Sequence, residues 1–212
     1  MQIVLLAIAI VLAYLIGSIP TSVWIGRMFY NVDIRSMGSG NAGATNTIRV
    51  LGYKAGIPVL IFDVFKGWLA VYIAHFFLKD SRSFPDLTDF KIMLAIAAVI
   101  GHVFPVYVKF KGGKGIATLL GVGIALYPLA ACIAVGIFAL TLGLTGYVSV
   151  ASIFASVTFP LVEIIFLGHH EHISLVLLSV VVAIFVPLTH RKNIFRLIAG
   201  TESKFSFRRK NS

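Results

Sequence analysis

Apolar residues dominate five stretches of the chain, and short polar segments separate these stretches. They cover residues 3–25, 55–78, 92–108, 116–168 and 173–189, and each contains few ionisable side chains. An α-helix rises about 1.5 Å per residue, so about 20 apolar residues cross the hydrocarbon core of a bilayer, which is roughly 30 Å thick. The pattern therefore predicts an all-α, polytopic membrane protein.

The fourth stretch is too long for a single crossing. As one helix, residues 116–168 would extend about 80 Å, and their single charged side chain is Glu163. Three crossings of about 17 residues fit a bilayer, with breaks predicted near Tyr127-Pro128 and Thr145-Gly146. We therefore predict about seven transmembrane helices in one domain, residues 1–212. A short re-entrant pass in place of one helix would lower that number.

Lysine and arginine indicate the orientation, because short loops rich in them stay in the cytoplasm. Residues 27–54 carry four, residues 109–114 carry three and residues 191–210 carry seven of the 18 basic residues. Residues 79–91 balance their basic residues with aspartates, and residues 168–172 have no lysine or arginine. This pattern predicts an outer N-terminus and a basic cytoplasmic tail from about residue 190, which we expect to lie on anionic lipid.

Composition supports a membrane protein. Apolar residues make up 58% of the chain and charged residues 12%, with a mean hydropathy of +0.97. The net charge of +10 resides in short loops, so we expect anionic substrates and lipid headgroups as partners and no nucleic acid. Cys132 is the single cysteine, which excludes an intrachain disulfide and a cysteine metal cluster. The first stretch lacks a preceding basic segment, so we expect a retained span and no secretory signal.

Two of the predicted cytoplasmic loops are rich in glycine and carry cations. In the first loop, glycines allow a close approach of the backbone to a ligand, and short polar side chains add hydrogen-bond donors. These residues are Gly38, Ser39, Gly40, Asn41, Gly43, Thr45 and Asn46, followed by Arg49, a bidentate donor for an oxyanion. A predicted helix through Leu51 would add its N-terminal amides to an anion site. A flexible turn with Ser39 or Asn41 as a helix cap is the alternative.

The second loop has the sequence KFKGGKG at residues 109–115. We expect its glycines to expose backbone N–H groups and Lys114 to add a point charge for phosphate. The candidate substrate-binding residues here are Lys111, Gly112, Gly113, Lys114 and Gly115. Lysines at a helix end also anchor a span to lipid headgroups, which is the alternative.

A third polar segment, residues 190–202, follows the last apolar stretch. His190 titrates near neutral pH and is a candidate base or phosphate donor, and Asn193 is a neutral donor and acceptor. We expect Glu202 to brace an arginine or lysine. Alternatively, the segment is a positive-inside stop signal. Asp63 and Lys66, an i,i+3 pair within the second span, predict a buried ion pair or a contact with the cytoplasmic site.

Two further patterns indicate no function. His75 and Asp80 have the His-x4-Asp spacing of many CoA-dependent acyltransferases, but they fall at the predicted outer end of the second span. The histidines and glutamate of residues 169–172 also fall outside, in a short polar turn. We therefore expect no metal site and no cofactor.

Six segments together make the sequence resemble the PlsY family, the acyl-phosphate:glycerol-3-phosphate acyltransferases of bacteria. They are GSIP at residues 17–20, GSGNAGATN at 38–46, DVFKG at 63–67, GHVFP at 101–105, KGGKG at 111–115 and residues 190–202. The resemblance implies seven membrane helices and transfer of an acyl group from acyl phosphate to the 1-hydroxyl of glycerol 3-phosphate. The products would be lysophosphatidic acid and inorganic phosphate, in the first acylation step of bacterial phospholipid synthesis.

Residue roles follow from the same resemblance. It implies catalytic roles for Ser39, Arg49, His190 and Asn193, a glycerol-phosphate site at residues 111–115, and a structural role for Glu202. The soluble enzyme that forms acyl phosphate is a further candidate partner. The expected location is the bacterial cytoplasmic membrane, with the site facing the cytoplasm.

The chemistry of a mixed anhydride is consistent with these loops. Acyl phosphate has a good leaving group, so positioning and charge suffice without a covalent nucleophile or a metal. Backbone amides of residues 38–41 are candidates for stabilising the oxyanion, and His190 or a phosphate oxygen for accepting the hydroxyl proton. The alternatives from other classes are an anion transporter, which places its substrate near the bilayer midplane, and a structural lipid-binding protein.

Overall fold

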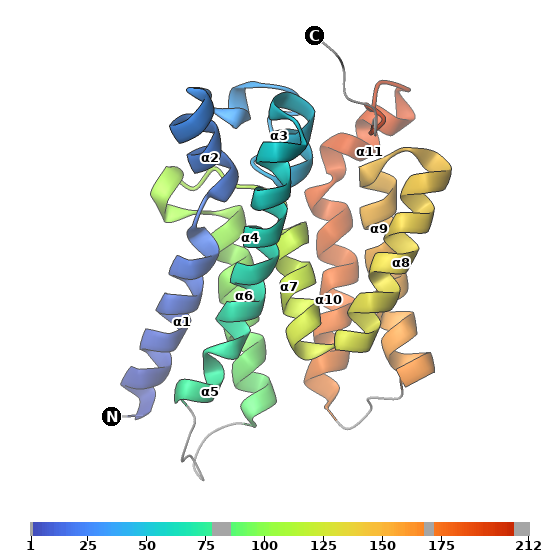
Figure 1. The fold of residues 1–212 in the computed structure, drawn as a ribbon. Coiled ribbons are helices and arrows are strands. Elements are labelled where there is room, and N and C mark those ends of the chain that lie inside the picture. Colours follow the sequence, from blue (N-terminus) through green and yellow to red (C-terminus); the bar gives the residue numbers. More distant parts are fainter. Residues whose placement is uncertain (1, 78–85, 168–171, 206–212) are drawn as a thin grey trace. The chain divides into compact units, whose positions relative to one another are not determined.

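The computed structural model describes residues 2–77, 86–167 and 172–205, and the regular elements within these ranges are helices (Figure 1). The chain divides into two compact units, Met1–Tyr127 and Pro128–Ser212. Each unit carries one of the polar clusters described below.

Unit 1 contains the first seven α-helices. They are α1 (Gln2–Ser18), α2 (Thr21–Tyr30), α3 (Ala44–Leu51), α4 (Tyr53–Tyr72), α5 (Ala74–Phe77), α6 (Leu87–Val103) and α7 (Ile116–Leu126), with the short helical turns η1 (Ile34–Ser36) and η2 (Val106–Val108). The chain bends by 42° between α1 and α2, where Pro20 lacks the N–H that would continue the helix. α2, α3 and the segment between α6 and α7 lie at one end of this unit, opposite the N-terminus (Figure 1).

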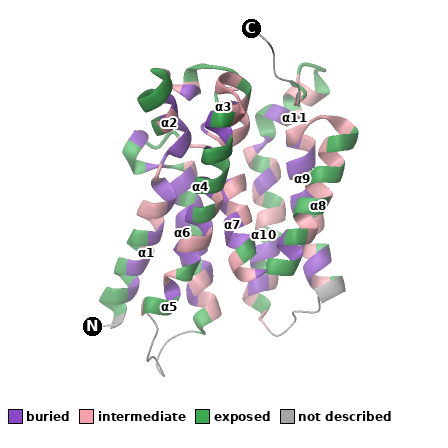
Figure 2. Cartoon of the chain, in the orientation of Figure 1, coloured by how far each residue is buried: buried purple, intermediate pink, exposed green. Residues whose placement is uncertain are grey.

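Small residues let the long helices of unit 1 approach closely. Ala9 and Ala13 of α1 and Ala98 of α6 are fully buried, together with Phe90 and Leu94. Figure 2 shows buried residues along α1, α4 and α6, while the exposed residues of the same helices are largely apolar. Close backbone packing of small residues is typical of membrane helices, where lipid surrounds the apolar outer face.

Unit 2 contains α8 (Pro128–Thr145), α9 (Val148–Leu161), the π-helical turn η3 (Val162–Leu167), α10 (Ile173–Thr189) and α11 (Arg191–Ile198). Proline is favourable at the first position of α8, because that N–H has no partner within the helix. Gly146 has a φ of 76° and makes the turn from α8 to α9. The chain bends by 56° between α10 and α11, so α11 leaves the direction of the long helix.

The predicted breaks in residues 116–168 are confirmed. α7 ends at Leu126 and α8 begins at Pro128, and α8 ends at Thr145, just before Gly146. Within the described residues, four helices are long and apolar enough to cross a membrane, or up to six if each bent pair is one span. α7 has 11 residues and extends only about 16 Å, less than a hydrocarbon core. The number of seven full crossings stays a prediction.

Candidate phosphate-binding end of unit 1

The first polar loop folds around the side chain of Asn46. This side chain is buried, and its Oδ1 accepts a hydrogen bond of 2.8 Å from the backbone N–H of Ser39. Its Nδ2 donates to the carbonyl oxygens of Ile34 and Met37, each at 3.0 Å. Asn46 was predicted to contact the substrate, but its amide is engaged in holding the loop together. Its burial favours a role as the scaffold of the loop.

The left-handed glycines of this loop set the position of Ser39. Gly38 has a φ of 60° and Gly40 a φ of 74°, a region that other residues rarely adopt. A Cβ on Gly38 would also collide with Oδ1 of Asn46. The backbone N–H groups of Ser39 and Gly40 are engaged with Asn46 and Met37. These two amides are therefore already used within the loop, contrary to the expectation that they stabilise an oxyanion.

The helix predicted after the glycines is present as α3. Gly43 precedes its first residue, Ala44, and the helix runs to Leu51. Asn41 and Thr45 are partly exposed near its N-terminus, where backbone N–H groups favour an anion. Arg49 lies in its last turn, is exposed, and makes no hydrogen bond or ion pair with another described residue. Its guanidinium is thus available to an anion.

The second loop caps the end of α6. The N–H of Gly112 donates to the carbonyl of Val103, and the N–H of Gly113 donates to the carbonyl of His102, both at 3.2 Å. These carbonyls belong to the last turn of the helix and have no partner within it. The expectation that Gly112 and Gly113 expose their N–H groups to a ligand is therefore wrong, because both groups are used by the helix end.

The two loops are in contact with each other. A Cβ on Gly113 would collide with the carbonyl of Ala42 in the first loop and with the ring of His102. Glycine is therefore required at this close approach. The contact places Gly113 and its partly exposed neighbour Lys114 beside the first loop.

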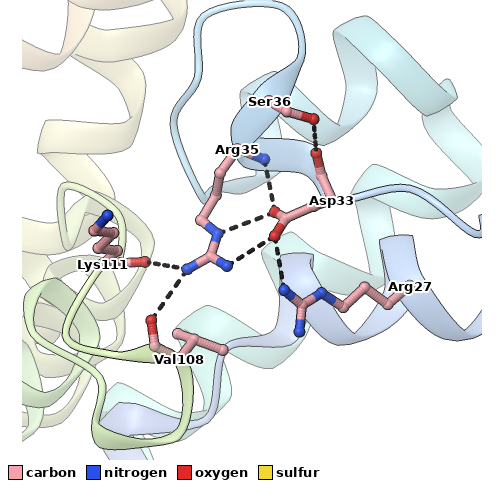
Figure 3. A network of polar contacts seen from close by, with 6 residues as sticks. All are labelled: Arg27, Asp33, Arg35, Ser36, Val108 and Lys111. Atoms are coloured by element: carbon pink, nitrogen blue, oxygen red, sulfur yellow. Dashed lines mark hydrogen bonds and ion pairs between the residues drawn. The ribbon is translucent and has the colours of Figure 1, made fainter.

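A network of charges also joins the two loops (Figure 3). Arg35 donates to both carboxylate oxygens of Asp33, from Nε at 3.0 Å and from Nη2 at 2.7 Å. Its Nη1 donates to the carbonyls of Val108 at 3.1 Å and Lys111 at 3.2 Å. Arg27 donates to Asp33 from the other side at 2.9 Å. The hydrogen bond from Arg35 holds the pKa of Asp33 well below its usual range, although partial burial raises it.

Arg35 and Asp33 were not predicted as site residues. Arg35 served only to indicate the orientation of the chain, because a single arginine in a loop does not reveal which carbonyls it contacts. The spacing of Asp33 and Arg35 was the available signal, since a carboxylate and a guanidinium two residues apart can pair across a turn.

The predicted ion pair of α4 is confirmed. Nζ of Lys66 lies 2.7 Å from Oδ1 of Asp63, and both side chains are buried. Lys66 also donates to the carbonyl of Ile19 at 2.8 Å, and Thr21 donates to Asp63 at 3.2 Å. The pair therefore ties α4 to the junction between α1 and α2.

His102, which was not predicted as a site residue, extends this buried cluster to the second loop. Its Nδ1 lies 3.0 Å from Oγ1 of Thr118 in α7 and 3.8 Å from Oδ1 of Asp63. The opposite side of its ring faces Gly113. The GHVFP segment at residues 101–105 was the signal that could have identified it. The cluster therefore contacts the second loop at Gly113.

The third predicted segment forms a separate cluster in unit 2. Glu202 accepts hydrogen bonds from Asn193 at 2.6 Å, Arg196 at 2.7 Å and Ser149 at 2.9 Å. Burial alone would raise the pKa of Glu202, but these three donors together lower it below its usual value. The expectation that Glu202 braces a basic residue is confirmed by Arg196. Asn193 is buried, and its amide takes part in the same cluster.

His190 connects α10 and α11. Its side chain is buried, and Nδ1 lies 2.9 Å from the carbonyl of Val186. A carbonyl only accepts hydrogen bonds, so Nδ1 carries the hydrogen and Nε2 is the basic atom of the neutral ring.

Within the described part of the chain, no three histidine, cysteine, aspartate or glutamate side chains form a metal-type group. His75 lies in α5, whereas Asp80 and residues 169–171 lie outside the described residues.

Comparisons with known proteins agree with one another. The family model described as glycerol-3-phosphate acyltransferase matches residues 7–200. A glycerol-3-phosphate acyltransferase of Fusobacterium nucleatum is 46% identical over 198 residues, covering 93% of this chain and 97% of the relative. One of Chlorobaculum tepidum is 43% identical over 225 residues, covering 95% and 97%.

Solved structures show the same likeness. A crystal structure of PlsY, an integral membrane glycerol 3-phosphate acyltransferase, in its glycerol 3-phosphate form is similar with a TM-score of 0.84 and 34% identity, covering 95% of this chain and 96% of the other. Its lysophosphatidic acid form has a TM-score of 0.82 and 33% identity, covering 95% of each chain.

Proposed function

Because the chain belongs to the glycerol-3-phosphate acyltransferase family, we propose that its acyl donor is acyl phosphate and that the two contacting loops of unit 1 hold the phosphate groups. The chain is an integral membrane enzyme that acylates glycerol 3-phosphate to lysophosphatidic acid. Family membership identifies the chain as an enzyme, so the alternatives of an anion transporter and a structural lipid-binding protein are excluded. The donor and the residue roles are the proposal.

The observation that carries the proposal is the contact between two cationic loops at one end of unit 1. Residues 34–62 and 92–118 contain no aspartate or glutamate, and the preceding Asp33 is paired with Arg35 and Arg27. These two loop segments therefore carry a surplus of positive charge, to which Arg49, Lys111 and Lys114 contribute. A phosphate ester with two negative charges fits this surplus, and an arginine fork binds two phosphate oxygens at once.

The reaction needs positioning and charge. The 1-hydroxyl oxygen of glycerol 3-phosphate attacks the carbonyl carbon of the acyl phosphate, and the bond from that carbon to the phosphate oxygen breaks. Inorganic phosphate leaves with the electron pair, and the acyl chain stays on the glycerol as an ester. Holding both phosphates close to one another converts this encounter into a local reaction.

We assign the binding of the phosphates to Arg49, Lys111 and Lys114. Ser39 lies between the left-handed Gly38 and Gly40 and is partly exposed, so its hydroxyl is proposed as a further donor to the substrate. Since the N–H groups of Ser39 and Gly40 are used within the loop, side chains carry more of the stabilisation of the oxyanion than the sequence alone suggested.

The hydroxyl proton has two candidate acceptors, a phosphate oxygen of the substrate and Nε2 of His190. The hydrogen bond between Nδ1 of His190 and Val186 supports the second candidate, because it leaves Nε2 as the basic atom. Asn193 is proposed to act through Glu202 and Arg196 by keeping the start of α11 in place. A His190→Gln variant with full turnover at saturating substrate would exclude histidine as the base and leave the phosphate.

The proposed location is the cytoplasmic membrane of a bacterium, with the site on the cytoplasmic side and the N-terminus outside. Support comes from the arginines and lysines of residues 27–54 and 109–114, since such loops stay on the cytoplasmic side. Membrane lipid is one proposed partner. The soluble enzyme that forms acyl phosphate is another.

The donor is tested by incubating the purified protein in lipid with labelled glycerol 3-phosphate and either palmitoyl phosphate or palmitoyl-CoA. We expect labelled lysophosphatidic acid and an equal amount of inorganic phosphate with palmitoyl phosphate alone. Product from palmitoyl-CoA in the absence of acyl phosphate would overturn the proposed donor. An Arg49→Ala variant is the negative control, because it removes a proposed phosphate-binding group and should keep α3 folded.

A further inference from the structure

We propose that Arg35 is a positioning residue for the second loop: its guanidinium bridges the carbonyls on both sides of a left-handed turn and thereby sets the positions of Lys111 and Lys114. This inference rests on the proposed phosphate-binding role of that loop. It adds a residue that contacts neither substrate nor reacting atoms.

The bridge spans a defined piece of backbone. Nη1 of Arg35 donates to the carbonyl of Val108 at 3.1 Å and to the carbonyl of Lys111 at 3.2 Å. Lys109 and Phe110 lie between these two carbonyls, so one nitrogen holds both ends of the turn (Figure 3).

The bridged turn has an unfavourable backbone conformation. Lys109 has a φ of 58° and Phe110 a φ of 57°, and neither is glycine. Two consecutive left-handed residues persist only where their surroundings impose the conformation. Phe110 is 57% exposed, so burial of its side chain contributes little to this conformation. Two backbone hydrogen bonds hold the turn, from the N–H of Phe110 to the carbonyl of Pro105 at 2.9 Å and from the N–H of Lys111 to the carbonyl of Val108 at 3.4 Å. The bridge from Arg35 adds a side-chain restraint on both ends of the turn.

Asp33 fixes the direction of the bridge. Its two carboxylate oxygens bind Nε and Nη2 of Arg35, which points Nη1 at the second loop. Four N–H groups of Arg35 are thereby used within the protein, so this arginine does not serve as a phosphate ligand as Arg49 is proposed to do. Arg27 shares Asp33 and contributes to the same charge balance, yet it donates to neither carbonyl of the turn.

The bridge acts on the residues that are proposed to hold phosphate. The carbonyl of Lys111 accepts one of the two hydrogen bonds from Arg35. The next two residues, Gly112 and Gly113, are bound to the end of α6. The backbone from residue 108 to residue 113 is therefore held at its start by Arg35 and at its end by α6. Without the bridge, Lys109 and Phe110 can leave the left-handed conformation. Lys111 then shifts, because it precedes Gly112 and Gly113, which are bound to the end of α6.

Three variants test the bridge through the KM for glycerol 3-phosphate. Arg35→Ala should raise this KM about tenfold or more, with a smaller change in kcat, because binding geometry is lost. Arg27→Ala is the matched control, since it removes an equal charge from the same aspartate, and should stay within about twofold. Adding Phe110→Gly to Arg35→Ala should recover at least about threefold, because glycine adopts the left-handed conformation without strain. General destabilisation by Arg35→Ala would not be relieved by a glycine at position 110.

The proposal is overturned if Arg35→Ala keeps the KM of the unaltered enzyme, if Arg27→Ala raises the KM equally, or if Phe110→Gly recovers nothing. Arg35→Lys is used if Arg35→Ala does not fold; one ammonium cannot serve Asp33 and both carbonyls, so the same rise in KM and the same recovery are expected.

Hydrogen exchange separates this proposal from the proposed function. Without any substrate, Arg35→Ala should speed exchange of the amides of Gly112 and Gly113, and Arg27→Ala should not. Unchanged exchange overturns the bridge even if the loop binds phosphate. Conversely, a Lys114→Ala variant with an unchanged KM overturns the phosphate-binding role of the loop, whatever the exchange shows.

Discussion

The amide of Asn46 connects three points of the first loop through its bonds to Ser39, Ile34 and Met37. Asn46→Asp has nearly the same shape, but a carboxylate cannot donate to the two carbonyls. Both carbonyls keep a backbone donor, Met37 N–H for Ile34 and Gly40 N–H for Met37, but the substitution places a buried carboxylate oxygen against them with no donor between, at a cost of about 1–3 kcal/mol or more. We expect a lower unfolding temperature and at least about a tenfold loss of acyl transfer, measured side by side in detergent. Full activity would show that the loop keeps its form without these bonds.

Glu202 makes the stability of unit 2 depend on pH. Its folded-state pKa lies below the ordinary value of 4.5, so its contribution to stability is complete above that pH and is lost as the pH falls through the lower folded value. Glu202→Gln removes the charge and keeps the size. The difference in unfolding temperature between the enzyme and this variant should be constant from pH 7 to about pH 5 and shrink below it. A difference that grows on acidification would contradict the assigned hydrogen bonds.

Between elements, the decisive contact is the one between Gly113, Ala42 of the first loop and the ring of His102. Gly113→Ala would force the two loops or α6 to shift, at a cost of about 1–3 kcal/mol. We expect a higher KM for glycerol 3-phosphate and a lower unfolding temperature. Gly143→Ala in α8 is the matched control, since nothing lies near its added Cβ, and alanine should stabilise a helix there by up to about 1 kcal/mol. Equal effects of both changes would contradict the close approach.

The helices and their breaks were predictable, because apolar length, Pro128 and Gly146 are local signals. The Asp63–Lys66 pair was predictable for the same reason, since its spacing places both side chains on one helix face. The hydrogen-bond acceptors of the loop amides were not predictable from the sequence. Gly112 and Gly113 suggest an anion site by composition, but their N–H groups satisfy the end of α6, which is a tertiary contact. The carbonyl partners of Arg35 were hidden likewise, because they lie more than 70 residues away in the chain.

For the whole molecule, the basic loops predict a cytoplasmic site. In a Cys132→Ser background, Lys111→Cys should react with an impermeant maleimide in inside-out vesicles and stay unlabelled in right-side-out vesicles. Asp86→Cys, at the start of α6 and so at the other end of that helix from the second loop, should show the opposite pattern. Labelling of both positions from one side would contradict the predicted crossing of α6.

The central claim is that the loops of unit 1 bind the phosphate of glycerol 3-phosphate, and equilibrium binding of the labelled compound to the protein in nanodiscs tests it most directly. Arg49→Ala and Lys114→Ala should each weaken binding about tenfold or more, because each removes a charged donor to phosphate. Lys54→Ala, which removes an exposed charge at the start of α4, should stay within about twofold. If all three variants bind as tightly as the unaltered protein, the phosphate lies elsewhere and the account is wrong.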